Sequence, residues 1–227
     1  MVSLDIEVIL QSLPRLMNGL QITLLLTFLS LILGTILGIL LAMGRSFGKF
    51  PLSTIIYGYE KIFRGIPLLV IFFLLYFGLF EIGINLEPIT AAVIGLGLRG
   101  AAYQAQIYRS AINSIPEGQS IAARSIGMSK LQTIRHIILP QVMRLSIPGW
   151  SNEFTIVLKD TSIAFSIGVI ELMRQGRYVY INHPELILPI FIIIAAIYFI
   201  LVIIANKSLG FLEKKYKMSG FNVSVER

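Results

Sequence analysis

The chain has 227 residues, of which 56% are hydrophobic and 14% charged, and its mean hydropathy of +0.81 excludes an ordinary soluble domain. It contains no cysteine, and His136 and His183 lie far apart, so we expect no thiol chemistry and no metal site. The net charge of +7 is placed between and after apolar segments, which indicates membrane orientation and not binding of nucleic acid.

Apolar runs of about 20 residues are long enough to cross a hydrocarbon core of about 30 Å. The predicted spans are approximately 20–43, 54–80, 89–112, 147–170 and 186–209. The segment 1–13 carries Asp5 and Glu7 and has no basic start, so we do not interpret the first span as a cleaved signal peptide. No internal repeat or linker is recognised, which predicts a single transmembrane domain over residues 1–227.

The basic residues concentrate in the segments after the first, third and fifth spans. They are Arg45, Lys49, Arg124, Lys130, Arg135, Arg144, Lys207, Lys214, Lys215 and Lys217. With five spans all these segments lie on one side, so the positive-inside rule predicts an outer N-terminus and a cytoplasmic C-terminus. The opposite side carries the acidic loop 81–87, although Arg15, Arg174 and Arg177 dilute the asymmetry.

A polar segment, Ser114–Pro140, interrupts the apolar pattern. Its charges preclude spanning, and about 27 residues are too few for a core of their own, so it must fold against another surface. Pro116 favours a helix start, Gly127 a helix end, and Ser129 with Gln132 a capping box, while Pro140 is expected to end the second helix. We therefore predict two short helices bent at Gly127. Periodicity alone leaves open whether they lie on their own membrane domain or dock against a partner.

The segment Gly118–Gln141 resembles the cytoplasmic coupling loop of ABC importer permeases, whose pattern is Glu-Ala-Ala, a Gly four residues later and a downstream Leu-Pro. Five residues match, and Ile121 stands where Glu is usual: the matches are Ala122, Ala123, Gly127, Leu139 and Pro140. The segments 63–70, 102–109 and 152–163 are similar to recurrent segments of the polar amino acid subfamily, which includes histidine, glutamine and arginine permeases. In the second of them Gln106 replaces a usual Glu. The resemblance covers residues 18–217.

This resemblance implies an all-α type I importer permease with about five transmembrane helices in the cytoplasmic membrane of a prokaryote. It also implies two cytoplasmic ATPases, an extracytoplasmic amino-acid-binding protein and a second permease subunit, identical or different. The five matching residues of the coupling loop would contact the ATPase. The sequence contains no GxxxxGK[ST] phosphate loop, so we expect no catalytic residue and no cofactor here, with ATP and Mg on the partner ATPase.

The alternative functional classes are a secondary transporter or channel and an intramembrane enzyme. A secondary transporter or channel not coupled to ATP would also place polar residues in spans, but it predicts an internal repeat that we do not recognise. An intramembrane enzyme would require a nucleophile with a base, or a metal pair, and the scattered Ser, His and Asp residues form neither at a recognisable spacing.

The fourth predicted span has one polar side. At 100° per residue, Glu153, Asp160 and Ile167 share a stripe, and an adjoining stripe contains Thr155, Lys159, Ser162 and Ser166. Charged groups at membrane depth usually face a cavity or a partner. Asp160 could receive the ammonium group of an amino acid, or Lys159 and Asp160 could pair with groups on neighbouring helices.

Arg99, in the third span, is the second candidate, with Tyr103 one turn further on. A guanidinium can hold a carboxylate through two hydrogen bonds, which suits the α-carboxylate of an amino acid. Arg99 could equally neutralise Glu60 or Asp160, while Glu60 and Arg64 have the spacing of a bridge along one helix. The candidate pathway residues are Asp160, Arg99, Glu153, Lys159, Thr161 and Tyr103. Gly34 and Gly38 predict a close helix crossing.

Overall fold

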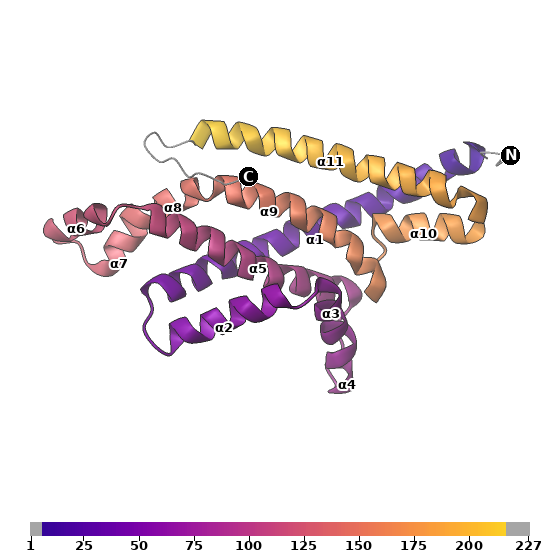
Figure 1. The fold of residues 1–227 in the computed structure, drawn as a ribbon. Helices are drawn as coiled ribbons and strands as arrows, with labels where there is room; N and C mark the ends of the chain where they lie inside the picture. Colours follow the sequence, from indigo (N-terminus) through magenta and orange to yellow (C-terminus); the bar gives the residue numbers. More distant parts are fainter. Residues whose placement is uncertain (1–5, 217–227) are drawn as a thin grey trace.

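The computed structural model describes residues 6–216, and these residues form helices and short connections without a β-strand (Figure 1). Asp5 and Lys217, on which two of the expectations drew, lie outside this range. The predicted all-α membrane fold is confirmed.

The helices are α1 (Ile6–Phe47), α2 (Leu52–Gly65), α3 (Leu68–Phe73), α4 (Leu79–Glu81), α5 (Pro88–Ser114), α6 (Glu117–Ser125), α7 (Lys130–Thr133), α8 (Leu139–Leu145), α9 (Ile147–Asp160), α10 (Leu172–Asn182) and α11 (Ile187–Tyr216). Turns of π-helix join α3 to α4 (Leu74–Gly78) and α7 to α8 (Ile134–Ile138). A 3₁₀ helix, Thr161–Ile167, continues α9, and a shorter one, Pro184–Leu186, precedes α11.

In the described part of the chain, fewer helices meet the length and hydropathy of a membrane span than the five predicted, and the predicted third and fourth spans, which fall in α5 and α9, are not among them. Within residues 6–216, α1 and the segment Pro184–Tyr216 are long and apolar enough to span, and α2 with α3–α4 would be a third span if the bent pair is counted as one. That pair is bent by 105°, so the predicted span 54–80 is not one straight helix. The bend has a local cause: Pro67 holds Ile66 in an extended conformation, with φ −90° and ψ 132°. In Figure 1, α3 and α4 project sideways from the bundle.

The first helix starts well before the apolar run that predicted it. Its N-terminal part packs on α10 and α11, where Leu16 is buried with Leu172, Leu186 and Ile190. Tertiary packing therefore supports helix in a stretch whose sequence is too polar to be recognised as a span.

Helices α1 and α5 approach closely because glycines line their crossing. A methyl group added at Gly34 would lie 2.8 Å from Nε2 of Gln104, and one at Gly38 would lie 2.9 Å from Cβ of the same residue. On the facing helix, a methyl group at Gly97 would lie 2.5 Å from Leu33. The close crossing predicted from Gly34 and Gly38 is confirmed.

The polar segment bends where the sequence predicts. Helix α6 starts directly after Pro116, and Gly127 has a φ of +88°, a left-handed conformation that favours glycine. The capping box is present: Gln132 N donates to Ser129 Oγ at 3.3 Å, and Ser129 N donates to Gln132 Oε1 at 2.8 Å.

Pro140 does not end the second helix, contrary to the prediction. Leu139 keeps helical angles, φ −57° and ψ −43°, and the helix continues to Leu145. The wider π-helical turn over Ile134–Ile138 precedes the proline and accommodates the lost backbone donor. Residues 130–145 are therefore one helical segment, and only the first of the two predicted helices is short.

We expect Gly38→Leu to destabilise the protein by about 1–3 kcal/mol, because its side chain has no space against α5. Gly58→Leu is the matched control, since nothing lies within 4 Å of an added Cβ there. Thermal unfolding of the purified protein in detergent measures both. Equal unfolding temperatures for the two variants would contradict the close crossing.

Candidate functional site

Arg99 on α5 and Asp160 at the end of α9 form an ion pair. Arg99 Nη1 donates to Asp160 Oδ2 at 2.5 Å, and the two side chains are 19% and 23% exposed. Of the two carboxylates that the sequence offered to Arg99, Asp160 is therefore its partner. Pairing lowers the cost of holding both charges among apolar helices, and the pair remains partly accessible.

Tyr103 joins this pair to the end of α2. The Arg99 Cζ atom lies 4.9 Å from the centre of the Tyr103 ring, and Arg64 Cζ lies 5.1 Å from the same centre. Cations over an aromatic face are attracted by its negative charge density. We call Arg64, Arg99, Tyr103 and Asp160 the arginine–tyrosine cluster. It brings α2, α5 and α9 together and presents guanidinium groups next to a carboxylate.

The predicted bridge between Glu60 and Arg64 was wrong. Glu60 is 1% exposed and pairs with Arg45 Nη1 of α1, while Arg109 Nη1 of α5 lies 3.8 Å from the same oxygen, Oε2. A nearly inaccessible carboxylate requires partners on the helices that cover it, and these are α1 and α5. Spacing along α2 alone could not reveal them.

The remaining pathway candidates occupy different surroundings. Glu153 is 3% exposed, its Oε1 has no hydrogen-bond partner among residues 6–216, and that atom would lie 3.7 Å from a methyl group at Gly100. Thr161 is fully buried and donates to the Leu158 carbonyl oxygen at 2.7 Å. Lys159 is exposed. The structure thus brings Arg99, Tyr103 and Asp160 into contact, places Glu153 behind them, and turns Thr161 toward its own backbone.

The polar stripe of the fourth span ends at Asp160. From Thr161 the chain is a 3₁₀ helix, which turns by about 120° per residue and rotates later side chains away from the stripe. Ile167, which the sequence aligned with Asp160, is buried at 2% exposure in the apolar core.

A buried polar network was missed in the sequence. Thr35 Oγ1 donates to Gln104 Oε1 at 2.8 Å, Trp150 Nε1 donates to Thr35 Oγ1 at 3.0 Å, and Tyr108 OH donates to Gln104 Oε1 at 3.2 Å. These bonds join α1, α5 and α9. The helical spacing of Gln104 and Tyr108 among alanines could have indicated a polar contact on this helix. No pattern in the sequence identified their partners on α1 and α9.

The polar segment Ser114–Pro140, which we call the coupling loop after the family resemblance, has an inner and an outer side. On the inner side Ala123 is 5% exposed, Gln141 Nε2 donates to Gln119 Oε1 at 2.6 Å, and Lys130 Nζ donates to the Phe47 carbonyl oxygen at 3.2 Å. The outer side carries apolar residues that are largely exposed: Ile121 at 63%, Ile126 at 80% and Leu131 at 74%, with Ala122 beside them. Leu139 is half-buried and Pro140 exposed. We call Ile121, Ala122, Ile126 and Leu131 the coupling surface.

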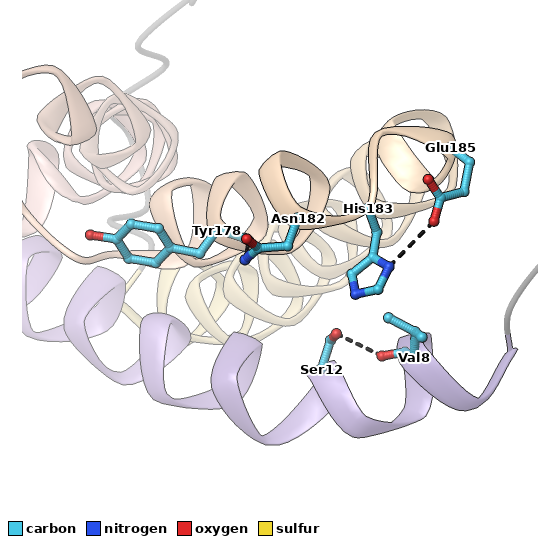
Figure 2. Close-up of polar contacts among 6 residues, drawn as sticks. All are labelled: Val8, Ser12, Tyr178, Asn182, His183 and Glu185. Carbon is cyan, nitrogen blue, oxygen red and sulfur yellow. Dashed lines mark hydrogen bonds and ion pairs between the residues drawn. The ribbon is translucent and has the colours of Figure 1, made fainter.

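The opposite end of the molecule holds a polar pocket of about 270 Å³ between the start of α1 and the end of α10 (Figure 2). His183 Nδ1 lies 3.3 Å from Glu185 Oε1, and Ser12 Oγ donates to the Val8 carbonyl oxygen at 2.7 Å. Figure 1 shows α6 and α7 at one end of the bundle and α10 at the other. Within residues 6–216, no three His, Asp or Glu side chains gather in a way that could hold a metal ion.

Comparison with known proteins gives consistent results. The family model of the binding-protein-dependent transport system inner membrane component matches residues 34–218. The probable amino-acid permease protein YxeN of Bacillus subtilis (strain 168) is 39% identical over 206 residues, which cover 89% of this chain and 91% of YxeN. The glutamine transport system permease protein GlnP of Escherichia coli (strain K12) is 32% identical over 217 residues, which cover 94% of this chain and 98% of GlnP.

A solved structure is similar over nearly the whole chain. The crystal structure of an amino acid ABC transporter with histidines superimposes with a TM-score of 0.85 and 34% sequence identity. The match covers 94% of this chain and 99% of that chain.

We expect Glu60→Ala to destabilise the protein by about 3–5 kcal/mol, because it leaves Arg45 and Arg109 without their shared carboxylate. Glu81→Ala, which removes an exposed carboxylate, should change stability by less than about 0.5 kcal/mol. Thermal unfolding in detergent compares the two. If both variants unfold at the same temperature, Glu60 is not a structural partner of these arginines.

Proposed function

The chain belongs to the family of binding-protein-dependent transport system inner membrane components and is a permease subunit of an amino-acid ABC importer; on that premise we propose how its residues carry and couple transport. The observation that carries the function is the likeness to amino-acid permeases over nearly the full length of the chain. The alternative of a transporter not coupled to ATP has no comparable support.

The arginine–tyrosine cluster is the proposed contact for the transported amino acid. The α-carboxylate would bind the guanidinium of Arg99, with Arg64 held close by on the same tyrosine ring, and the α-ammonium would bind Asp160. Three observations support this: opposite charges 2.5 Å apart, their partial exposure, and the aromatic ring that orients both arginines. An arriving zwitterion would break the Arg99–Asp160 ion pair and form one new pair with each residue, so binding would leave no charge unpaired.

The other pathway residues have supporting roles in this proposal. Lys159 lines the exposed side next to Asp160, and Glu153 places a buried carboxyl group behind Arg99. Thr161 fixes the change from α-helix to 3₁₀ helix that ends the polar stripe.

The coupling surface is the proposed contact with a cytoplasmic ATPase. Exposed isoleucine and leucine side chains on a polar segment need a partner, and the usual Glu is replaced by one of them, Ile121. We place two ATPase subunits with ATP and Mg on this side, since no phosphate loop is recognised in this sequence. Small and rigid residues would shape the loop for close contact with the ATPase. They are Ala122, Ala123, Gly127 and Pro140, with Leu139 beside them.

The remaining partners follow from this orientation. The extracytoplasmic binding protein would deliver the amino acid at the end formed by α10 and the start of α1. A second permease subunit, identical or different, would complete the pathway in the cytoplasmic membrane of a prokaryote. Residues 1–227 would act as one multi-pass domain.

Motion of the coupling loop has a direct route to the cluster. Helices α8 and α9 follow one another across Ser146, where Ser146 N donates to the Val142 carbonyl oxygen at 2.9 Å and Trp150 N donates to the Ser146 carbonyl oxygen at 2.8 Å. Asp160 is the last residue of α9. Closure of the ATPases would therefore act on the residue that holds Arg99, as alternating access between two states requires.

We expect Arg99→Asp and Asp160→Arg each to lower the uptake of amino acid about tenfold or more, the effect of losing one charged hydrogen bond. The double swap should restore folding and assembly but not uptake, because the charges then face the substrate in reverse. Initial uptake rates into proteoliposomes containing the assembled transporter measure this. Normal uptake by the double swap would assign the pair to structure alone.

We expect Gly127→Val to lose ATPase assembly and uptake, because a β-branched residue at a φ of +88° forces the loop to change shape. Gly127→Asn is the matched control, since asparagine tolerates left-handed angles. Co-purification of the ATPase subunit is the measurement. Full assembly with Gly127→Val would show that the bend is not needed for docking.

A further inference from the structure

A second cavity lies between the coupling loop and the membrane helices. It has a volume of about 690 Å³ and is formed by the end of α1, the end of α5, the start of α6 and Ile138. This cavity is separate from the arginine–tyrosine cluster, none of whose residues lines it. Its volume is in the range of small-molecule sites.

Three charged side chains line the cavity, and they have unequal freedom. Arg45 is engaged by the buried carboxylate of Glu60, whereas Arg109 lies 3.8 Å from that carboxylate and is 27% exposed. A guanidinium has five N–H donors, so Arg109 retains donors for another acceptor. On the α6 side of the cavity, Glu117 is exposed and has no ion-pair partner among residues 6–216.

The remaining lining is mixed. Ser46 contributes a buried hydroxyl that has no hydrogen-bond partner among residues 6–216, and Asn113 and Ser120 add further polar groups. Ile112 and Ile115 make part of the wall apolar, and Ile121, a residue of the coupling surface, also lines the cavity. The cavity thus offers the guanidinium of Arg109 on α5, the carboxylate of Glu117 on α6 and an apolar wall. These groups complement a molecule that carries a negative charge, a positive charge and a side chain.

We propose that this cavity is a second amino-acid site, open to the cytoplasm on the proposed orientation. The α-carboxylate binds Arg109, the α-ammonium binds Glu117, and the side chain lies against the isoleucines. A simple anion fits less well because Glu117 repels it, and a simple cation is repelled by Arg109. This inference rests on the proposed function, which supplies the amino acid and the orientation.

Occupation of the site has a mechanical effect. Arg109 belongs to α5 and Glu117 to the first turn of α6, so a bound amino acid ties the coupling loop to the membrane helices. A loop held in this way cannot follow the ATPases as they close. Accumulated amino acid on the inside therefore slows further uptake.

The test uses the complete transporter in vesicles of phosphatidylcholine and phosphatidylglycerol, whose headgroups lack a primary ammonium. Uptake of each of the twenty standard amino acids into empty vesicles first identifies the fastest substrate. Uptake of that substrate is then measured in vesicles preloaded with it, unlabelled, over a range of concentrations. We expect preloading to inhibit uptake, and preloading with inorganic phosphate to leave uptake unchanged.

The decisive variant is Glu117→Gln, which removes the carboxylate charge with little change in shape. Its uptake into empty vesicles should equal that of the unmodified protein, whereas the internal concentration for half-inhibition should rise about tenfold or more. Arg109→Gln should give the same rise. Glu81→Gln, an exposed carboxylate far along the chain from this cavity, is the matched control and should leave both values unchanged.

Each contrary result has its own meaning. Equal half-inhibition in the unmodified protein and in Glu117→Gln, or no inhibition by preloading, would overturn the second site while leaving the proposed function intact. Inhibition by phosphate as strong as that by the amino acid would overturn the zwitterion as its ligand. No uptake of any of the twenty amino acids would instead overturn the proposed function, and the second site with it.

Discussion

The cost of placing charge among apolar helices is the constraint on which this structure depends. A side chain that keeps its charge in the interior needs a partner of opposite charge, because an isolated ion there would be neutralised or would force the helices apart. Glu60 satisfies this rule with Arg45 and Arg109, and Arg99 satisfies it with Asp160. These few pairs connect α1, α2, α5 and α9. The packing of the helices and the pairing of their charges therefore depend on each other.

Two further kinds of contact hold the same helices together, namely close packing at glycines and buried hydrogen bonds. Gly34 and Gly38 let α1 approach α5, and the hydrogen bonds of Thr35, Gln104 and Trp150 hold α9 against both. These groups are largely shielded, whereas Arg99 and Asp160 remain partly accessible. Buried polar groups that are hydrogen-bonded to one another favour a single arrangement of the helices that carry them. The chain thus places a partly accessible ion pair on a frame of closely packed helices.

Local chemistry was predictable from the sequence, and contacts between distant residues were not. The left-handed Gly127 and the capping box of Ser129 depend on a few neighbouring residues, so their patterns predicted them. The partner of Glu60 depends on how α1 and α5 pack, which no spacing along α2 reveals. The effects of two prolines were not predicted correctly: the predicted span 54–80 ran through Pro67, where the chain bends, whereas the expected effect of Pro140 is absorbed by a π-helical turn. For the site, polar residues were recognised while their pairing was left open.

The near-continuous run of α8 and α9 makes the molecule sensitive to small angles. The 22 residues Leu139–Asp160 extend over about 33 Å at 1.5 Å per residue. A tilt of only about 5° at the coupling end would carry the far end through about 3 Å, comparable to the length of a hydrogen bond. Leverage of this kind needs no unfolding and no large rearrangement of side chains. A helical segment of this length is by itself enough to amplify a slight rotation at one end into the making or breaking of one ion pair at the other.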